Sequence, residues 1–110
     1  MDKNKTIGVD IDGILCTETP YSYRLMAQPK RNTINIINEL YDAGHTIIIF
    51  TARGWNEYDL TEMQLKGFYV KFHRLICGKP MFDVFIDDRA VSTTKELLLK
   101  LEEEDNDTTD

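Results

Sequence analysis

The stretch that most constrains this fold runs from Thr6 to Ile14 and has the sequence TIGVDIDGI. Its β-branched residues at alternate positions predict a buried strand, and Gly13 gives the backbone freedom to turn out of the sheet directly after the acids. In an open α/β sheet, ligands bind outside the carboxyl ends of the strands, so Asp10 and Asp12 fall where a site would lie. Both acids are equally compatible with a simple turn, because Asp before Gly commonly ends a strand. The ends of the other strands decide between these alternatives.

The rest of the chain alternates strand and helix patterns. Further strands are expected within residues 45–51, within 68–76 and at 84–86. Helices are expected from Asn32 or Thr33 to Gly44, from about Asn56 to Lys66, and after a capping box formed by Thr93 and Glu96. Prolines and polar clusters predict an irregular segment at residues 14–31, called the flap below, with a short turn at 23–27. Short connections predict parallel βαβ units with right-handed crossovers. We therefore expect an α/β fold with a small, Rossmann-like, doubly wound and mainly parallel sheet.

Length and charge bound the organisation of the chain. A length of 110 residues fits a single domain, placed at residues 1–101 and followed by an acidic, disordered tail at 102–110. Six of the 19 acids lie in that tail, so the body keeps 13 acids against 13 bases. A neutral body gives no basic footprint for nucleic acid.

The sequence also argues against a membrane-spanning protein, a secreted protein and a cysteine-based site. No run is long and apolar enough to span a bilayer, and the N-terminus has no signal-peptide core, so the expected compartment is the cytoplasm. Cys16 and Cys77 form no CxxC pair or metal-ligand cluster, so both are expected to be reduced and incidental.

Polar side chains occur at the carboxyl end of each expected strand. In chain order these residues are Asp10 and Asp12, Thr51, Lys79, and Asp87 and Asp88. Because the carboxyl ends of parallel strands share one edge of the sheet, we expect these side chains to lie together. An acid pair, a hydroxyl, a lysine and a second acid pair are hard to obtain from turn chemistry alone.

This combination suits phosphoryl transfer. A carboxylate that attacks a phosphate needs a cation between the two anions, and an all-oxygen site suits Mg²⁺. The expected metal ligands are Asp10, Asp12 through its main-chain carbonyl, Asp87 and Asp88. Lys79 would supply positive charge and Thr51 a neutral donor to the phosphoryl oxygens.

The two acids of the first strand are expected to do different work. Asp10, beside the metal, would stay ionised and attack phosphorus to give an aspartyl-phosphate. Asp12, directed away from the metal, would protonate the leaving oxygen and then activate the hydrolytic water.

At this point the residues resemble a known family. Asp10-x-Asp12-Gly13, Thr51, Lys79 and Asp87-Asp88 resemble the four motifs of the haloacid dehalogenase (HAD) superfamily, over about residues 6–90. The resemblance implies a Rossmann-like fold, Mg²⁺ dependence, Asp10 as nucleophile, Asp12 as general acid and base, Thr51 and Lys79 as phosphate ligands, and Asp87 and Asp88 as metal ligands. The segments FTAR at 50–53, GKP at 78–80 and IDDRA at 86–90 resemble a short branch associated with bacterial capsule and surface-polysaccharide genes.

Many HAD members carry a cap domain, but the gaps between the motifs of this chain are too short for a second packed core. We expect a capless protein with an open site. Such a site suits a large substrate that reaches in from solvent, or a homo-oligomer in which a neighbouring subunit covers it.

Substrate recognition must then come from the flap and from arginines near the site. Thr51, Lys79, Arg53 and Gly13 are the predicted phosphate- and substrate-binding residues, and Arg53 would bind a second anionic group or else be a surface arginine paired with a nearby acid. The wider set of specificity candidates is Tyr21, Tyr23, Lys30, Arg31, Arg53, Trp55 and Arg89.

The leading interpretation is a Mg²⁺-dependent phosphatase that acts on a sugar phosphate or a related small metabolite. The alternatives are a phosphatase for a phosphorylated polymer end or protein, and a non-catalytic module that binds metal or phosphate. A receiver-like signalling domain also uses an acid cluster, a Thr and a Lys, but no Asp ends the third expected strand here.

Overall fold

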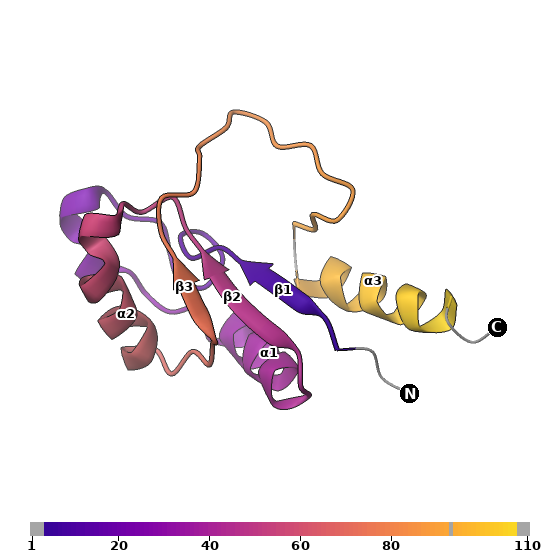
Figure 1. Cartoon of the computed structure of the whole chain (residues 1–110). Coiled ribbons are helices and arrows are strands. Elements are labelled where there is room, and N and C mark those ends of the chain that lie inside the picture. The colour runs from indigo at the N-terminus through magenta and orange to yellow at the C-terminus, as the bar shows by residue number, and fades with distance from the viewer. Residues whose placement is uncertain (1–3, 93, 108–110) are drawn as a thin grey trace. The chain divides into compact units, whose positions relative to one another are not determined.

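The computed structural model describes residues 4–92 and 94–107 (Figure 1). The sequence predicts one domain, whereas the structure divides the chain into two compact units, Asn4–Met81 and a second unit from Phe82 onward. Each unit is described by itself.

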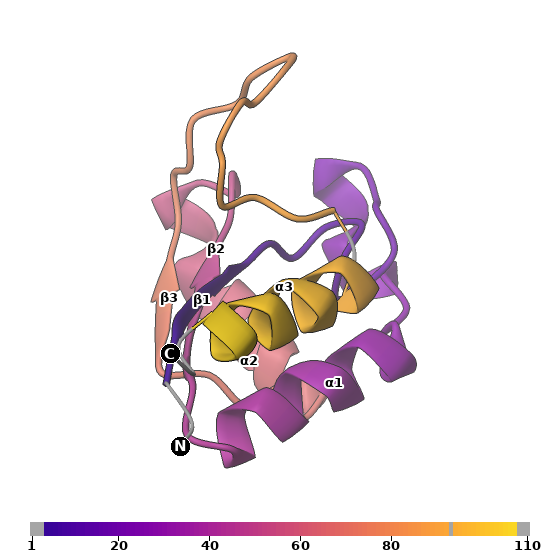
Figure 2. The ribbon, with the colours of Figure 1, turned by 90° about the vertical axis from the view of Figure 1, so that its right-hand side faces the viewer.

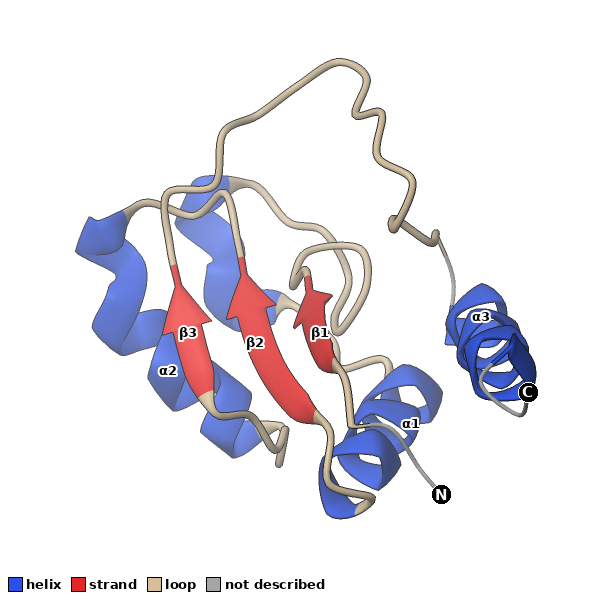
Figure 3. Cartoon of the chain, turned by 45° about the vertical axis from the view of Figure 1, so that its right-hand side comes forward, coloured by secondary structure: helices blue, strands red, loops and turns tan. Residues whose placement is uncertain are grey.

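The first unit is built on a parallel sheet of β1 (Thr6–Val9), β2 (Thr46–Phe50) and β3 (Arg74–Ile76) in the order β1-β2-β3. Thr6 pairs with Thr46 across the first ladder, and Ile48 pairs with Arg74 across the second. All three strands point the same way, so their carboxyl ends share one edge (Figure 3). The expected α/β, Rossmann-like fold with a parallel sheet is thereby confirmed.

Two helices connect these strands, α1 (Arg31–Asp42) and α2 (Tyr58–Gly67). In the order β1-β2-β3 both crossovers step in the same direction, so right-handed connections place both helices on one face of the sheet. Figures 1 and 2 show this arrangement. The predicted doubly wound sheet needs a reversal of this direction, and the strands within the described residues do not contain one.

The core lies between this sheet face and the two helices. It is formed by Ile7, Val9, Ile47, Ile49, Leu75, Ile34, Ile37, Leu40 and Leu65. On the opposite sheet face Thr6 and Gly8 are exposed. Phe50, the last residue of β2, is 40% exposed. The β2 strand is therefore fully buried on the helix-covered face only.

The flap closes back on itself at its base. The Thr17 N–H donates to the Gln28 carbonyl, and the Gln28 N–H donates to Thr17 Oγ1, both at 2.9 Å. Between them lies the short helix η1 (Tyr21–Met26), close to the predicted turn. Before them Leu15 and Cys16 are fully buried, so the start of the flap belongs to the core.

The second unit differs from the sequence prediction at residues 84–86. This segment forms no strand, and Val84, Phe85 and Ile86 are 75%, 62% and 92% exposed. An apolar triplet has strand propensity, but a strand exists only when a neighbour completes its ladder of hydrogen bonds.

The last helix, α3 (Thr94–Asp107), is found where a helix was expected. Its N-terminus is held by Ser92, whose N–H and Oγ both bond Glu96 Oε2, at 2.9 and 3.0 Å. The predicted capping residue Thr93 lies outside the described residues. α3 continues to Asp107, so residues 102–107 are helical and not the disordered tail expected there. None of the described helices is long and apolar enough to cross a membrane.

Candidate active site

Asp10 and Lys79 meet at the carboxyl edge of the sheet. Asp10 directly follows β1, and Lys79 lies in the loop after β3, where its N–H donates to the Thr51 carbonyl at 2.8 Å. Lys79 Nζ lies 3.2 Å from Asp10 Oδ2, and the two side chains are 29% and 40% exposed. Asp10 Oδ1 accepts a hydrogen bond from the Ile11 N–H at 2.8 Å. The structure thus presents an oriented carboxylate next to a cation, and both are open to a ligand.

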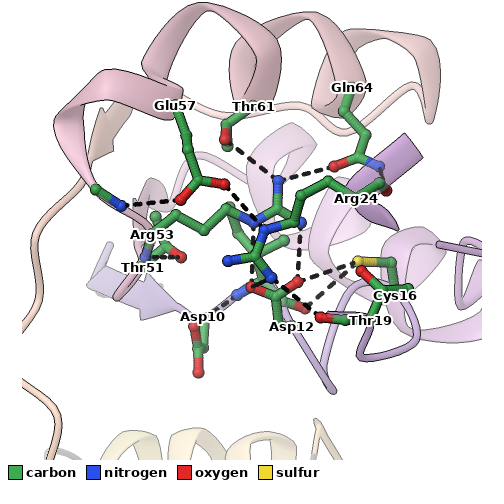
Figure 4. A network of polar contacts seen from close by, with 12 residues as sticks. Asp10, Asp12, Cys16, Thr19, Arg24, Thr51, Arg53, Glu57, Thr61 and Gln64 are labelled. Carbon is green, nitrogen blue, oxygen red and sulfur yellow. Dashed lines mark hydrogen bonds and ion pairs between the residues drawn. The ribbon is translucent and has the colours of Figure 1, made fainter. Parts of the chain in front are cut away.

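Asp12 lies in the opposite environment, as Figure 4 shows. Arg53 Nε lies 3.1 Å from Asp12 Oδ2, and Arg53 Nη2 lies 2.8 Å from Asp12 Oδ1. This bidentate pair is the strongest geometry that a guanidinium and a carboxylate can form. The Arg53 side chain is 0% exposed and that of Asp12 is 22% exposed. Asp12 therefore points into the protein, whereas Asp10 points away from this pair.

The remaining nitrogen of Arg53 is bound to α2. Arg53 Nη1 donates to Thr61 Oγ1 at 3.2 Å and to Gln64 Oε1 at 2.8 Å. Every guanidinium nitrogen therefore has a partner within the chain, and none is left for an anionic substrate. In this arrangement Arg53 has no nitrogen without a partner for a second anionic group, so the geometry favours the alternative role expected for it. The arginine pairs with an acid instead, and it does so in the interior.

The flap joins the same group of side chains through Arg24. Arg24 Nε donates to Glu57 Oε1 at 2.9 Å, and Arg24 Nη1 lies 3.7 Å from Asp12 Oδ2. Gln64 Nε2 donates to the Arg24 carbonyl at 2.6 Å. Burial lowers the pKa of Arg24, but the hydrogen bond to Glu57 and the charge of Asp12 outweigh it, so the net pKa is raised. We call Asp12, Arg24, Arg53, Glu57, Thr61 and Gln64 the Arg53 cluster.

The sequence analysis did not predict most members of the Arg53 cluster. Arg24, Thr61 and Gln64 carry no local signal for a contact so far along the chain. Glu57 has a signal, because it follows Gly54 by three residues as in a capping box, and its Oε2 accepts the Gly54 N–H at 3.2 Å.

Two predicted phosphate-binding residues have internal roles instead. The Gly13 N–H donates to the Cys16 carbonyl at 2.8 Å, and Gly13 has a φ of 85°, so this glycine makes the turn after Asp12 and offers no free N–H. Thr51 is 1% exposed, and its Oγ1 accepts the Arg53 N–H at 3.1 Å. In this arrangement Thr51 supports the turn after β2 and is closed to a ligand.

Cys16 lies against the inner side of Asp12, with its Sγ 4.0 Å from Asp12 Oδ1. Burial raises the pKa of this thiol, and the negative charge of Asp12 raises it further. The pKa of Cys77 is also raised, by burial first and by Glu57 second. Both thiols are therefore poor nucleophiles, as expected for incidental cysteines.

The residues predicted to bind Mg²⁺ belong to two different units, so each unit is considered by itself. Asp10 fits as a ligand because it is an open carboxylate, and Mg²⁺ binds proteins through one or two carboxylates together with waters. The Asp12 side chain does not fit, because Arg53 occupies both of its oxygens, which leaves only its main-chain carbonyl. Among residues 4–92 and 94–107, no three His, Cys, Asp or Glu side chains form a group that could hold a metal.

Asp87 and Asp88, the other predicted ligands, lie in the second unit. Asp87 Oδ1 accepts the Arg89 N–H at 2.7 Å, and the Asp88 side chain is 94% exposed. Asp88 is exposed, but its Oδ1 lies 4.0 Å from Arg89 Nε, so this carboxylate is loosely paired. Asp87 keeps one oxygen beside the one that accepts the Arg89 N–H.

A cavity of about 420 Å³ opens beside the Arg53 cluster. It is lined by Tyr21, Ser22, Tyr23, Arg24, Leu25, Met26, Asn56, Glu57 and Leu60. Neither Asp10 nor Lys79 lines it, so it lies apart from the open carboxylate.

Comparison with known proteins supports the fold. No protein-family model and no curated protein matches the sequence. A crystal structure of a structural-genomics target from Vibrio cholerae is similar over 94% of this chain and 99% of that one, with 26% identity and a TM-score of 0.68. A chain of the Pnkp1/Rnl/Hen1 complex is similar over 88% of this chain, with 20% identity and a TM-score of 0.61, but this chain spans only 34% of its length. Both similarities support the α/β, Rossmann-like fold.

Proposed function

We propose that this chain is a capless, Mg²⁺-dependent phosphomonoester hydrolase of the haloacid dehalogenase superfamily, acting on a sugar phosphate or a related small metabolite. The observation that carries the proposal is the open Asp10–Lys79 pair at the carboxyl edge of a parallel sheet. The ordered motifs in the sequence and the two structural similarities support it.

Asp10 is the nucleophile in this proposal. One of its carboxylate oxygens attacks phosphorus, the bond from phosphorus to the leaving oxygen breaks, and an aspartyl-phosphate forms. Lys79 stands 3.2 Å from the attacking carboxylate, so its charge also reaches an oxygen of the incoming phosphoryl group. Water then attacks the aspartyl-phosphate, which releases inorganic phosphate and restores Asp10.

Asp12 is the proton carrier in this proposal. It protonates the leaving oxygen and later accepts a proton from the hydrolytic water. Because both Asp12 oxygens accept hydrogen bonds from Arg53, a protonated Asp12 must give up one of them. Arg53 and Arg24 would therefore control when Asp12 can carry a proton.

Within the first unit Mg²⁺ would be held by Asp10 and the main-chain carbonyl of Asp12, and Asp87 and Asp88 of the second unit are the further ligands that the sequence predicts. When bound, it supplies positive charge between the nucleophile and the phosphoryl group.

The test is phosphate release by the wild-type chain and by Asp10→Asn, with Mg²⁺ and with a chelator. The substrates are a generic aryl phosphate and a panel of sugar and nucleoside monophosphates. We expect turnover that requires Mg²⁺ and vanishes in Asp10→Asn. Equal inactivity of both proteins on every substrate would contradict small-metabolite hydrolysis and favour a polymer substrate or a non-catalytic role.

A further inference from the structure

We propose that Trp55 is the platform on which the ring of the substrate's leaving group stacks. The proposal rests on the proposed function, and it assigns that site a substrate class: phosphomonoesters whose ester oxygen lies on or next to a ring. Trp55 opens the short helix η2 (Trp55–Glu57) in the loop after β2, at the same sheet edge as Asp10.

The indole is presented as a surface and is not part of the core. Trp55 is 59% exposed, whereas tryptophan is on average a highly buried residue. It stacks on Tyr58, with ring centroids 5.9 Å apart and an angle of 12° between the planes. Tyr58 begins α2, so a rigid element supports one side of the aromatic pair. A supported and exposed ring loses little freedom when a ligand stacks on it.

Trp55 lies against the loop that carries Lys79. A Cβ atom on Gly78 would come within 2.9 Å of Trp55 Nε1 and 3.2 Å of its Cδ1, so only glycine lets the indole approach this backbone. The Gly78 N–H donates to the Arg53 carbonyl at 2.8 Å, which ties the two loops together. The indole is therefore a neighbour of the residue that precedes Lys79.

This placement puts the indole beside the loop that carries Lys79. Gly78 and Lys79 have Cα atoms about 3.8 Å apart, so we infer that a phosphoryl group at Lys79 and a ring on Trp55 would belong to one molecule. Lys79 Nζ also lies 5.7 Å from the centre of the Phe50 ring. The edge thus combines charge for a phosphoryl group with an aromatic surface for what the phosphoryl group is attached to.

A sugar ring with an apolar C–H face and a nucleobase both stack on indole. The kinetic test compares a hexose phosphate and a nucleoside monophosphate with glycerol phosphate, which has no ring. For Trp55→Leu we expect the preference for a ring substrate over glycerol phosphate, as a ratio of kcat/KM, to fall about ten-fold, mainly through KM. Trp55→Phe should restore most of the preference. The ring substrate whose kcat/KM falls more in Trp55→Leu shows whether a sugar or a nucleobase stacks on the indole.

Tyr69→Asn is the matched control. Tyr69 is 78% exposed at the turn after α2, and its φ of 59° is one that asparagine tolerates. This variant removes an exposed aromatic ring elsewhere and should keep the wild-type preference. An unchanged preference for ring substrates in Trp55→Leu, or an equal fall of this preference in both variants, would overturn the proposal that Trp55 binds the ring.

A second test does not depend on catalysis. Trp55 is the only tryptophan of the chain, so its fluorescence reports on this position alone. In Asp10→Asn we expect a saturable change of emission with the ring-bearing phosphate and a much smaller one with glycerol phosphate or inorganic phosphate. If emission responds but no phosphomonoester is hydrolysed by the wild type, the platform stands and the hydrolase proposal fails. If the enzyme is active and emission does not respond to ring ligands, the platform is refuted.

Discussion

Replacing Asp12 by alanine should destabilise the fold by about 3 kcal/mol, while Asp10→Ala should cost less than about 1 kcal/mol. Asp12→Ala leaves the Arg53 guanidinium, 0% exposed, without its carboxylate. Breaking a buried ion pair from one side costs about 3–5 kcal/mol. We take the lower end because Asp12 itself is 22% exposed, so solvent reaches the space it leaves. The Asp10–Lys79 pair is much more exposed and behaves as a surface pair.

Thermal unfolding followed by circular dichroism measures this difference. For a chain of this size, 1 kcal/mol corresponds to a shift of the Tm of roughly 4 °C, so Asp12→Ala should melt about 12 °C below the wild type and Asp10→Ala within about 4 °C of it. Both variants remove one acid from the same loop, so each is the control for the other. Equal shifts, or a larger shift for Asp10→Ala, would refute the division into an open and an internally paired acid.

A double-mutant cycle isolates the pair itself. Arg53→Ala combined with Asp12→Ala should cost less than the sum of the two single changes, because either change alone already breaks the pair. We expect a coupling energy of about 1–3 kcal/mol. Additive effects would show that the two groups contribute independently.

Three further outcomes are expected. Lys79→Met should lower kcat about 100-fold or more, as loss of a charge-stabilising donor does, with little change in Tm, and Lys79→Arg should retain part of the activity; unchanged kcat would contradict the role of Lys79. Gly13→Ala should destabilise the fold by about 1–3 kcal/mol in a urea titration, because φ is 85° and a Cβ would lie 3.2 Å from Glu18 Oε1. Cys16 should react with a thiol reagent only slowly in the native state and rapidly in urea. Burial raises its folded pKa, so the stability it contributes is full below the unfolded pKa of about 8.5 and is lost as pH rises through the folded value. Cys16→Ala should lose less stability than the wild type as pH rises. An equal loss of stability in both proteins would contradict the raised pKa of Cys16.

The local patterns predicted the elements of the first unit. Alternating β-branched residues located β1, a continuous β-branched run located β2, and Gly44 correctly marked the end of α1, with a φ of 101°. These features depend on residues close together in the chain, so the sequence displays them directly. The meeting of Asp10 and Lys79 was also predictable, because parallel strands bring their carboxyl ends to one edge.

The pairing of Asp12 with Arg53 could not be predicted, because it depends on strand register. Thr6 pairs with Thr46 and Val9 with Ile49, so β1 and β2 end side by side and the loops that follow them, which carry Asp12 and Arg53, begin at neighbouring points. Hydrophobic patterns show that strands exist but do not fix which residues lie opposite each other. Without the register, the sequence left open whether Arg53 binds an anionic ligand or pairs with an acid, and it did not identify Asp12 as that acid.

The strand predicted at residues 84–86 is absent for a related reason. Its three apolar residues satisfy every local criterion for a strand, yet none of them belongs to a strand. Propensity is local, whereas a strand requires a partner from elsewhere in the chain.

The central claim, that Asp10 is the nucleophile of a phosphatase, is tested most directly by trapping its phosphorylated form. The wild-type chain is mixed with Mg²⁺ and the best substrate of the panel, quenched rapidly in acid, digested and analysed by mass spectrometry. We expect one added phosphoryl group on the peptide that contains Asp10, absent in Asp10→Asn. A phosphoryl group on another residue, or substrate turnover with no phosphorylated peptide, would contradict it.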